Sequence, residues 1–117
     1  MAGNKELYQS IVQELLIEYA QIPYLQENLT DETIFDQESG RFLLVTVGWQ
    51  ERTRVNTIVL DLGIVDDRVW IQCNNTDQDI AEELIQRGIP RASIVVPKAV
   101  GANHLSQPHP LREFAMA

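Results

Sequence analysis

Cysteine, basic residues and long apolar runs are all scarce in this chain of 117 residues. Cys73 is the only cysteine, which excludes an internal disulfide and a zinc site built from several cysteines. A single cysteine also fits a reducing compartment, so we expect a cytoplasmic protein. No apolar run approaches the roughly 18 residues of a membrane-spanning helix, and the start of the chain contains no apolar signal region. The length suits one domain, which we expect over residues 1–117.

Nine basic residues stand against 17 acidic ones, which gives a formal charge of −8. DNA-binding surfaces need clustered Lys and Arg to contact phosphates, so the charge argues against an extensive direct contact with DNA. The same reasoning argues against an anionic membrane surface. A basic protein partner is compatible with the charge, and so is a protein that is simply kept soluble by it.

Patterns that signal catalysis or cofactor binding are also missing. There is no Gly-rich phosphate loop. His104 and His109 lie in a proline-containing tail with no cysteine nearby, so we interpret them as solvated side chains and not as metal ligands. Cys73 has no adjacent base that would make it a nucleophile. We therefore expect no catalytic residue, no metal site and no cofactor.

One acidic cluster keeps an enzymatic alternative open. Asp77, Asp79, Glu82 and Glu83 gather within seven residues, but they lack the alternating ligands and central glycine of a calcium loop. Their position suits the start of a helix, where negative charge is favourable. The alternative is a small enzyme or ligand-binding domain, such as a hydrolase or nuclease subunit, that uses the Asp77–Glu83 carboxylates.

Short runs rich in β-branched and aromatic residues dominate the middle of the chain. They are too short for helices and are separated by polar turns, so residues 42–49, 55–61 and 69–73 are predicted to be consecutive antiparallel strands. Shorter strand candidates lie at 32–36 and 93–96. The sequence thus predicts an α+β fold whose sheet is an antiparallel meander of four to five strands.

The strand at 42–49 has no polar face. Alternation places Leu43, Val45, Val47 and Trp49 on one side and the even-numbered residues, which end at Gly48, on the other. We expect this strand to be central in the sheet, or to meet another subunit with one face. A glycine inside a strand indicates a bulge or a close approach to backbone.

Two amphipathic helices are predicted to cover the sheet. The first spans residues 4–20, with Asn4 as its N-cap, and its apolar stripe comprises Leu7, Tyr8, Ile11, Val12, Leu15, Leu16 and Tyr19. The second lies near 76–87, with Thr76 as its N-cap and Gly88 at its end. An antiparallel sheet usually buries one face, and both stripes suit that use. The stripe of the first helix also suits contact with a partner chain.

Four of the nine basic residues lie on or beside the meander, and we expect them to pair with the surplus carboxylates rather than to form a positive patch: Arg41, Arg52, Arg54 and Arg68. The candidate interaction surface on the meander is Trp49, Arg52, Arg54 and Trp70. We expect a homodimer, or a complex with another protein, formed through the meander or the first helix.

Several motifs come in the order found in a known family. They include Val47-Gly-Trp49, Val69-Trp-Ile-Gln72, Gly88-Ile-Pro90 and Glu113-Phe-Ala115, and together they extend over nearly the whole chain. The chain resembles the XisI family, the fdxN element excision controlling factors found mainly in cyanobacteria. Asp61 stands where family members tend to carry histidine, and the segment Pro97–Arg112 is longer than in the family and altered.

The resemblance implies a small accessory protein linked to programmed excision of a DNA element. It implies a regulator that acts beside a separate recombinase and a partner, an XisH-like protein. No serine or tyrosine nucleophile surrounded by arginines is visible in the sequence, which agrees with a regulator. The expectation is a non-enzymatic module that works through protein contacts.

Overall fold

Residues 3–23 and 28–97 are described by the computed structural model of this chain. The elements in chain order are α1 (Gly3–Ala20), β1 (Leu29–Asp36), β2 (Arg41–Gln50), β3 (Thr53–Val65), β4 (Arg68–Asn74), α2 (Ile80–Gln86), the 3-10 helix η1 (Arg91–Ser93) and β5 (Ile94–Val95). Each strand candidate of the sequence is present. The first four strands are longer than the apolar segments from which they were predicted, because strand pairing continues through the polar residues at their ends.

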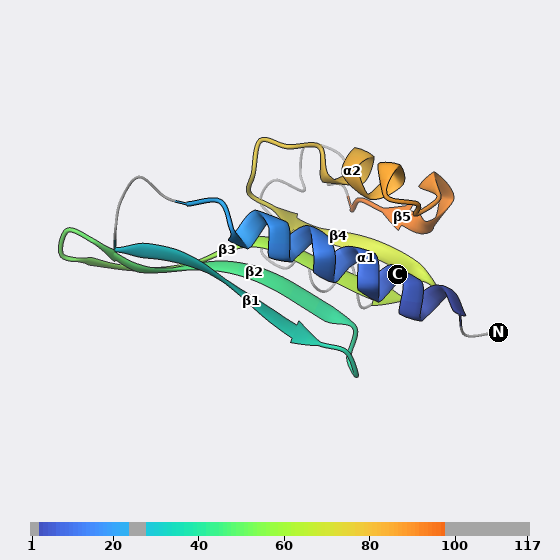
Figure 1. The fold of residues 1–117 in the computed structure, drawn as a ribbon, viewed down its shortest axis with the longest axis horizontal. Helices are drawn as coiled ribbons and strands as arrows, with labels where there is room; N and C mark the ends of the chain where they lie inside the picture. The colour runs from blue at the N-terminus through green and yellow to red at the C-terminus, as the bar shows by residue number, and fades with distance from the viewer. Residues whose placement is uncertain (1–2, 24–27, 98–117) are drawn as a thin grey trace, which may run out of the picture.

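The five strands form one sheet in the order β1-β2-β3-β4-β5. The first four strands make an antiparallel meander, and β5 pairs with β4 in parallel. The predicted α+β meander is confirmed, and β2 has a strand on each side as expected. Figure 1 shows the order of the strands and the long hairpin made by β2 and β3.

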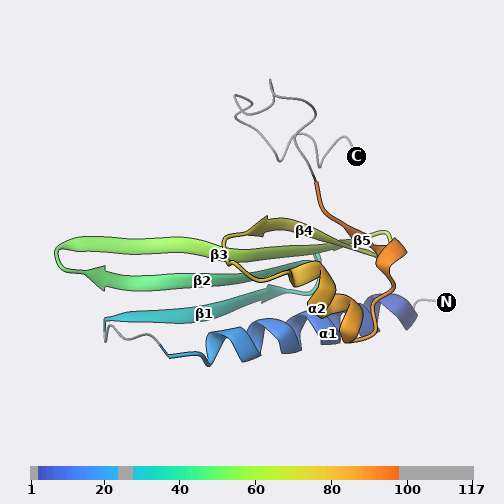
Figure 2. The ribbon, with the colours of Figure 1, turned by 90° about the horizontal axis from the view of Figure 1, so that it is seen from above.

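Both helices lie on the same face of the sheet, as the two ribbon views show (Figures 1 and 2). The strand register brings the even-numbered apolar residues of β2 and β3 and the odd-numbered apolar residues of β4 onto the face of the sheet that the helices cover. The fully buried side chains of this core are Val12, Leu15, Leu16, Phe42, Leu44, Leu60, Leu62, Val69, Ile80, Leu84 and Ile89. Burying a side chain of this size contributes about 1.5–3 kcal/mol, so this covered face holds the fold together.

Polar contacts tie the two helices to each other and to η1. The Tyr19 hydroxyl donates to a Glu83 carboxylate oxygen at 2.7 Å, and the Arg87 guanidinium donates to Glu18 at 2.7 Å. The Tyr8 hydroxyl donates to the Ser93 hydroxyl at 3.2 Å. The helix layer is therefore joined across 64 to 85 residues of sequence.

Two turn positions follow from backbone chemistry. Asp66 and Asp67 both have positive φ in the two-residue turn between β3 and β4, which is the geometry that such tight hairpins favour.

Gly48 has a φ of 144°, and a Cβ atom at this position would lie 1.8 Å from the carbonyl oxygen of Asn28. The predicted close approach to backbone at Gly48 is confirmed.

Both predicted N-caps were wrong. Asn4 lies within α1, which begins at Gly3. The N-cap of α2 is Asp79, whose side chain accepts from the Glu82 amide, and the helix begins only at Ile80. Thr76 instead belongs to the preceding turn, where its hydroxyl donates to Asn74 and accepts from the Gln78 amide.

The stripe of α1 is buried except at its start. Leu7 is 51% exposed, although Tyr8 in the next position is only 3% exposed. The prediction of a buried stripe is therefore confirmed from Tyr8 onward and wrong for Leu7. The tail histidines His104 and His109, and most of the altered segment Pro97–Arg112, lie outside the described residues.

Candidate interaction surface

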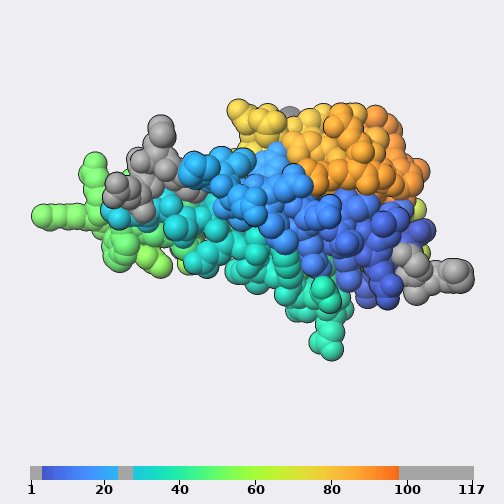
Figure 3. All heavy atoms as spheres, in the orientation of Figure 1, coloured from blue at the N-terminus to red at the C-terminus, as the bar shows by residue number. Residues whose placement is uncertain are grey.

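The hairpin of β2 and β3 projects past the end of α1 as an arm. We define the hairpin arm as residues 45–58, with its tip at Glu51 and Arg52. Figure 3 shows it as a narrow green projection beside the thicker helix-covered body. Five of the six β3 residues from Thr53 to Ile58 are exposed, whereas Leu60 to Ile64 are all buried.

The face of the sheet opposite the helices has no helix on it among the described residues (Figure 2). The strand register and the alternation of side chains along each strand identify the residues that lie on this face. We call it the open face, and its apolar members are Ile34, Leu43, Val45, Val47, Trp49, Ile58, Val65 and Trp70.

Several large apolar side chains of the open face are exposed to solvent. Trp49 is 49% exposed, Ile34 50%, Ile58 40% and Val65 47%. Single exposed apolar residues are ordinary, but these come from three adjacent strands on one face. The expectation that one face of β2 is free to meet another chain is compatible with this arrangement.

The four candidate residues separate into two groups. Trp49 lies directly opposite Arg54 in the β2–β3 register, and the Arg54 guanidinium lies 5.3 Å from the centre of the Trp49 ring. Arg52 is in the exposed turn at the tip. Trp70 is level with Gly63 and the first residue of β2, so about 27 Å of strand separates it from Trp49 at the usual rise per residue.

A polar cluster interrupts the apolar surface near Trp70. Arg41 donates to Asp61 at 2.8 Å, and the Asp61 side chain is only 10% exposed. A Cβ atom on Gly63 would lie 2.9 Å from Gln72 Nε2 and 3.7 Å from Arg41 Cδ, so both side chains cross over this glycine. Arg41 Nε, Asp61 Oδ1 and Gln72 Oε1 are buried without a hydrogen bond. The cluster therefore retains hydrogen-bonding capacity.

The sequence pointed to only part of this surface. Ile34, Ile58 and Gln72 were missed, because nothing local indicates which face of a strand the helices will cover. The expectation that the meander arginines pair with carboxylates holds for Arg41 alone. Within the described residues, Arg54 packs on a ring, and Arg52 and Arg68 have no carboxylate within 4 Å.

The acidic cluster near α2 is occupied by structural contacts. Asp79 caps the helix, Glu83 accepts from Tyr19, and Glu82 lies 3.6 Å from Arg91. Across residues 3–23 and 28–97, no group of three or more His, Cys, Asp or Glu side chains is placed to hold a metal ion. The Asp77–Glu83 carboxylates thus do not converge on one point.

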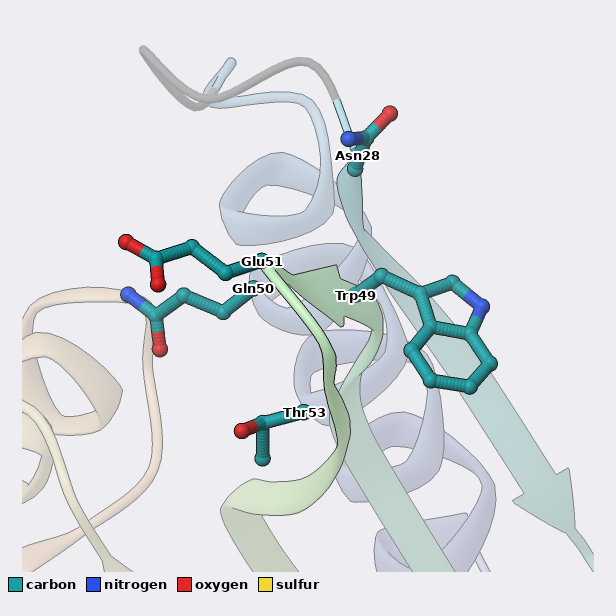
Figure 4. Close-up of a pocket in the computed structure, with 5 residues that line it drawn as sticks. All are labelled: Asn28, Trp49, Gln50, Glu51 and Thr53. Carbon is teal, nitrogen blue, oxygen red and sulfur yellow. The ribbon is translucent and has the colours of Figure 1, made fainter.

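Two hollows in the surface have little catalytic character. The first, of about 450 Å³, lies at the base of the arm tip and is lined by Asn28, Trp49, Gln50, Glu51 and Thr53. Figure 4 shows their side chains diverging, with the Trp49 ring turned away from Glu51. The second, of about 250 Å³, includes Cys73, where burial and then the charge of Asp61 raise the pKa of the thiol. A raised pKa disfavours the thiolate and hence nucleophilic attack.

Comparisons with known proteins identify the family. The family model for XisI protein matches residues 2–115. The chain belongs to the XisI family. No curated protein matches it. Within the described residues, no helix has the length and apolar character to cross a membrane.

Two solved structures share the XisI fold with this chain. A XisI-like protein from Anabaena variabilis is 35% identical with a TM-score of 0.74, over 78% of this chain and 84% of that one. The fdxN element excision controlling factor XisI from the same species is 28% identical with a TM-score of 0.67, over 79% and 84% of the two chains. The resemblance inferred from the motifs is confirmed.

Proposed function

We propose that this protein is a non-enzymatic regulatory factor for programmed excision of a DNA element, and that it acts by contacts with other proteins. Membership of the XisI family and similarity to a protein named as an excision controlling factor support the regulatory role. The observation that carries the mode of action is the open face, where three strands present exposed apolar side chains on the side of the sheet that no described helix covers.

The chemistry of the open face suits a specific protein partner. Trp49 presents a large apolar ring that is half exposed, and tryptophan and arginine are the side chains that contribute most to binding at interfaces. The ion pair of Arg41 and Asp61 lies on the same face, and the Arg41 side chain is 41% exposed. An apolar surface with a few polar groups matches the composition of protein interfaces. The partner we propose is an XisH-like protein.

The enzymatic alternative gains no support from the geometry. Asp79, Glu82 and Glu83 each have a structural partner, and Tyr19 donates to Glu83 instead of leaving it free as a base. The charge of −8 continues to argue against direct DNA binding. The cytoplasmic location stays a prediction from the single cysteine.

Capture of a purified XisH-like protein tests the proposal. Wild-type chain is expected to bind it in isothermal titration calorimetry, and Trp49→Ala to weaken binding at least tenfold. Leu7→Ala is the matched control, because Leu7 is an equally exposed apolar residue on the helix layer. If wild type and Trp49→Ala bound equally well, the open face would not be the binding surface. If wild type did not bind, an XisH-like protein would not be the partner.

A further inference from the structure

The outer edge of the hairpin arm is an unused strand edge. β4 pairs with β3 only from Leu60 to Val65. From Thr53 to Val59, β3 pairs with β2 on one side, and the structure places no described strand on the other. Along this half of β3 the outward backbone groups have no strand partner, and Asn75 contacts only the carbonyls of Ile58 and Val59 at the base of the arm.

The register shows which residues point their backbone outward. The Trp49 amide donates to the Asn28 carbonyl on the β1 side at 3.0 Å, so its backbone groups point away from β3. Trp49 and Arg54 are consequently a non-hydrogen-bonded pair of the β2–β3 ladder. The backbone N–H and C=O of Arg54 must then point outward, and by alternation those of Asn56 and Ile58 do so as well.

One contact at the base of the arm agrees with this assignment. Asn75 Nδ2 donates to the Ile58 carbonyl at 2.8 Å from the outer side. Within the described residues, no hydrogen bond reaches the outward groups of Arg54 or Asn56.

Away from its base, the edge has few of the features that usually block strand addition. Natural edge strands carry charged side chains, proline, β-bulges or a covering element. Here the register shift at Val59 and the contact from Asn75 are confined to the base of the arm, and Arg54 is the one charged residue. Residues 53–59 read Thr-Arg-Val-Asn-Thr-Ile-Val, which has five β-branched side chains, no proline, no lysine and no acidic residue in a chain of charge −8. This segment is already held as a strand by β2, so pairing would require little further ordering.

We propose that two copies of this chain pair antiparallel through residues 54–58 of β3, around a two-fold axis at Asn56. Outward residues then face outward residues: Asn56 faces its own copy, and Arg54 faces Ile58. The Ile58 carbonyl accepts from Asn75 with one lone pair and has a second for the Arg54 amide of the other copy. No acidic residue faces another, and the two Arg54 side chains are kept apart. A self-complementary patch of this kind is what a two-fold dimer requires.

The pairing also extends the open face from one copy to the next. Arg54 and Ile58 are both open-face residues, so the apolar surface of one copy continues across the join into that of the other. A single short strand pair is smaller than the roughly 1,200 Å² of a stable specific interface, so the dimer is expected to be weak and to form in concentrated protein. This inference deepens the homodimer expectation and does not depend on an XisH-like partner.

Proline at Asn56 removes the central outward N–H without touching the β2–β3 ladder, and proline is tolerated at strand edges. Asn56→Ala is the matched control, because it keeps the N–H. Light scattering at about 100 µM is expected to give twice the 13.3 kDa chain mass for wild type and Asn56→Ala. We expect the single mass for Asn56→Pro, with an unchanged far-UV circular dichroism spectrum. A monomeric wild type, or a dimeric Asn56→Pro, would overturn the proposal.

Cysteine cross-linking decides the geometry if the proline variant fails to fold. In a Cys73→Ala background, Asn56→Cys places two thiols opposite each other at a Cα separation of about 5.5 Å, which permits a disulfide. Arg54→Cys is equally exposed, but its two copies lie about 13 Å apart along the strands. Mild oxidation is expected to cross-link Asn56→Cys at least tenfold faster than Arg54→Cys.

Equal rates of cross-linking would contradict pairing at Asn56. Because neither measurement uses an XisH-like protein, its outcome is independent of the capture experiment. A wild type that is monomeric alone but captures the partner would refute this inference and leave the proposed function standing.

Discussion

The two halves of β3 differ in both sequence and surroundings. Residues 60–64 lie under the helices and between two strands, whereas residues 53–58 have β2 on one side and no helix over them among the described residues. The outer half carries mainly polar side chains, whereas the inner half is mainly aliphatic. Composition and packing therefore agree: the inner half stabilises the fold and the outer half is available for binding.

Replacing one aliphatic side chain by alanine in each half of β3 should give the largest difference in the free energy of unfolding. Leu60 is 0% exposed and Ile58 is 40% exposed, two residues apart on the same strand. Leu60→Ala leaves a cavity and is expected to lower the free energy of unfolding by about 2–5 kcal/mol. Ile58→Ala should lower it by about 0.5 kcal/mol, as a surface change does. Urea denaturation of dilute protein measures both, and similar losses would show that the arm is part of the stabilising core.

Gly48 anchors the arm to the start of β1 and should be the next most sensitive position. Its φ is 144°, and the Asn28 carbonyl oxygen would lie 1.8 Å from an added Cβ atom, so there is no space for alanine. Gly48→Ala is expected to cost about 2–3 kcal/mol, from strain and the shift of β1. At Gly63, alanine would meet only the flexible end of Gln72, so Gly63→Ala should cost less. Thermal denaturation compares the two, and the reverse order would contradict the close approach at Gly48.

Much of the covered side could be predicted from sequence, because its patterns are local. The stripe of α1 from Tyr8 to Tyr19, the turn at Asp66 and Asp67, and the end of α2 at Gly88 each follow from spacing or backbone preference. The N-caps failed because several polar residues competed for one role, and Asp79 prevailed over Thr76.

The open face was harder to predict, because its location depends on long-range packing. Alternation along β2 gave two apolar faces but did not indicate which one the helices would cover. Trp49 and Arg54 were among the candidates named on the meander, whereas Ile58 and Gln72 were not. The partner itself came from family resemblance and not from any residue pattern.

The smallest expected effect concerns a surface ion pair of the helix layer. Hydrogen bonds from Arg87, together with its charge, hold the pKa of Glu18 below its ordinary 4.5. The folded state therefore binds this proton less readily than the unfolded state. The stabilisation is complete above about pH 4.5 and is lost as the pH falls through the lowered folded pKa.

Glu18→Gln should accordingly be slightly less stable than wild type at pH 7, and the difference should shrink towards pH 3. Melting temperatures of the two proteins across this range provide the measurement. Glu6→Gln on the same helix is the control, because Glu6 makes no ion pair with the described residues. A difference that persists unchanged at pH 3 would contradict the electrostatic origin.

Residue-resolved amide exchange along β3 tests the division between a stabilising half and a binding half most directly. The outward amides of Arg54 and Asn56 are expected to exchange quickly in dilute protein and to become protected in concentrated protein, while Leu60 and Leu62 stay protected in both. Exchange at Arg54 and Asn56 that is slow in dilute protein, or equally fast at every concentration and with an XisH-like protein added, would contradict the account.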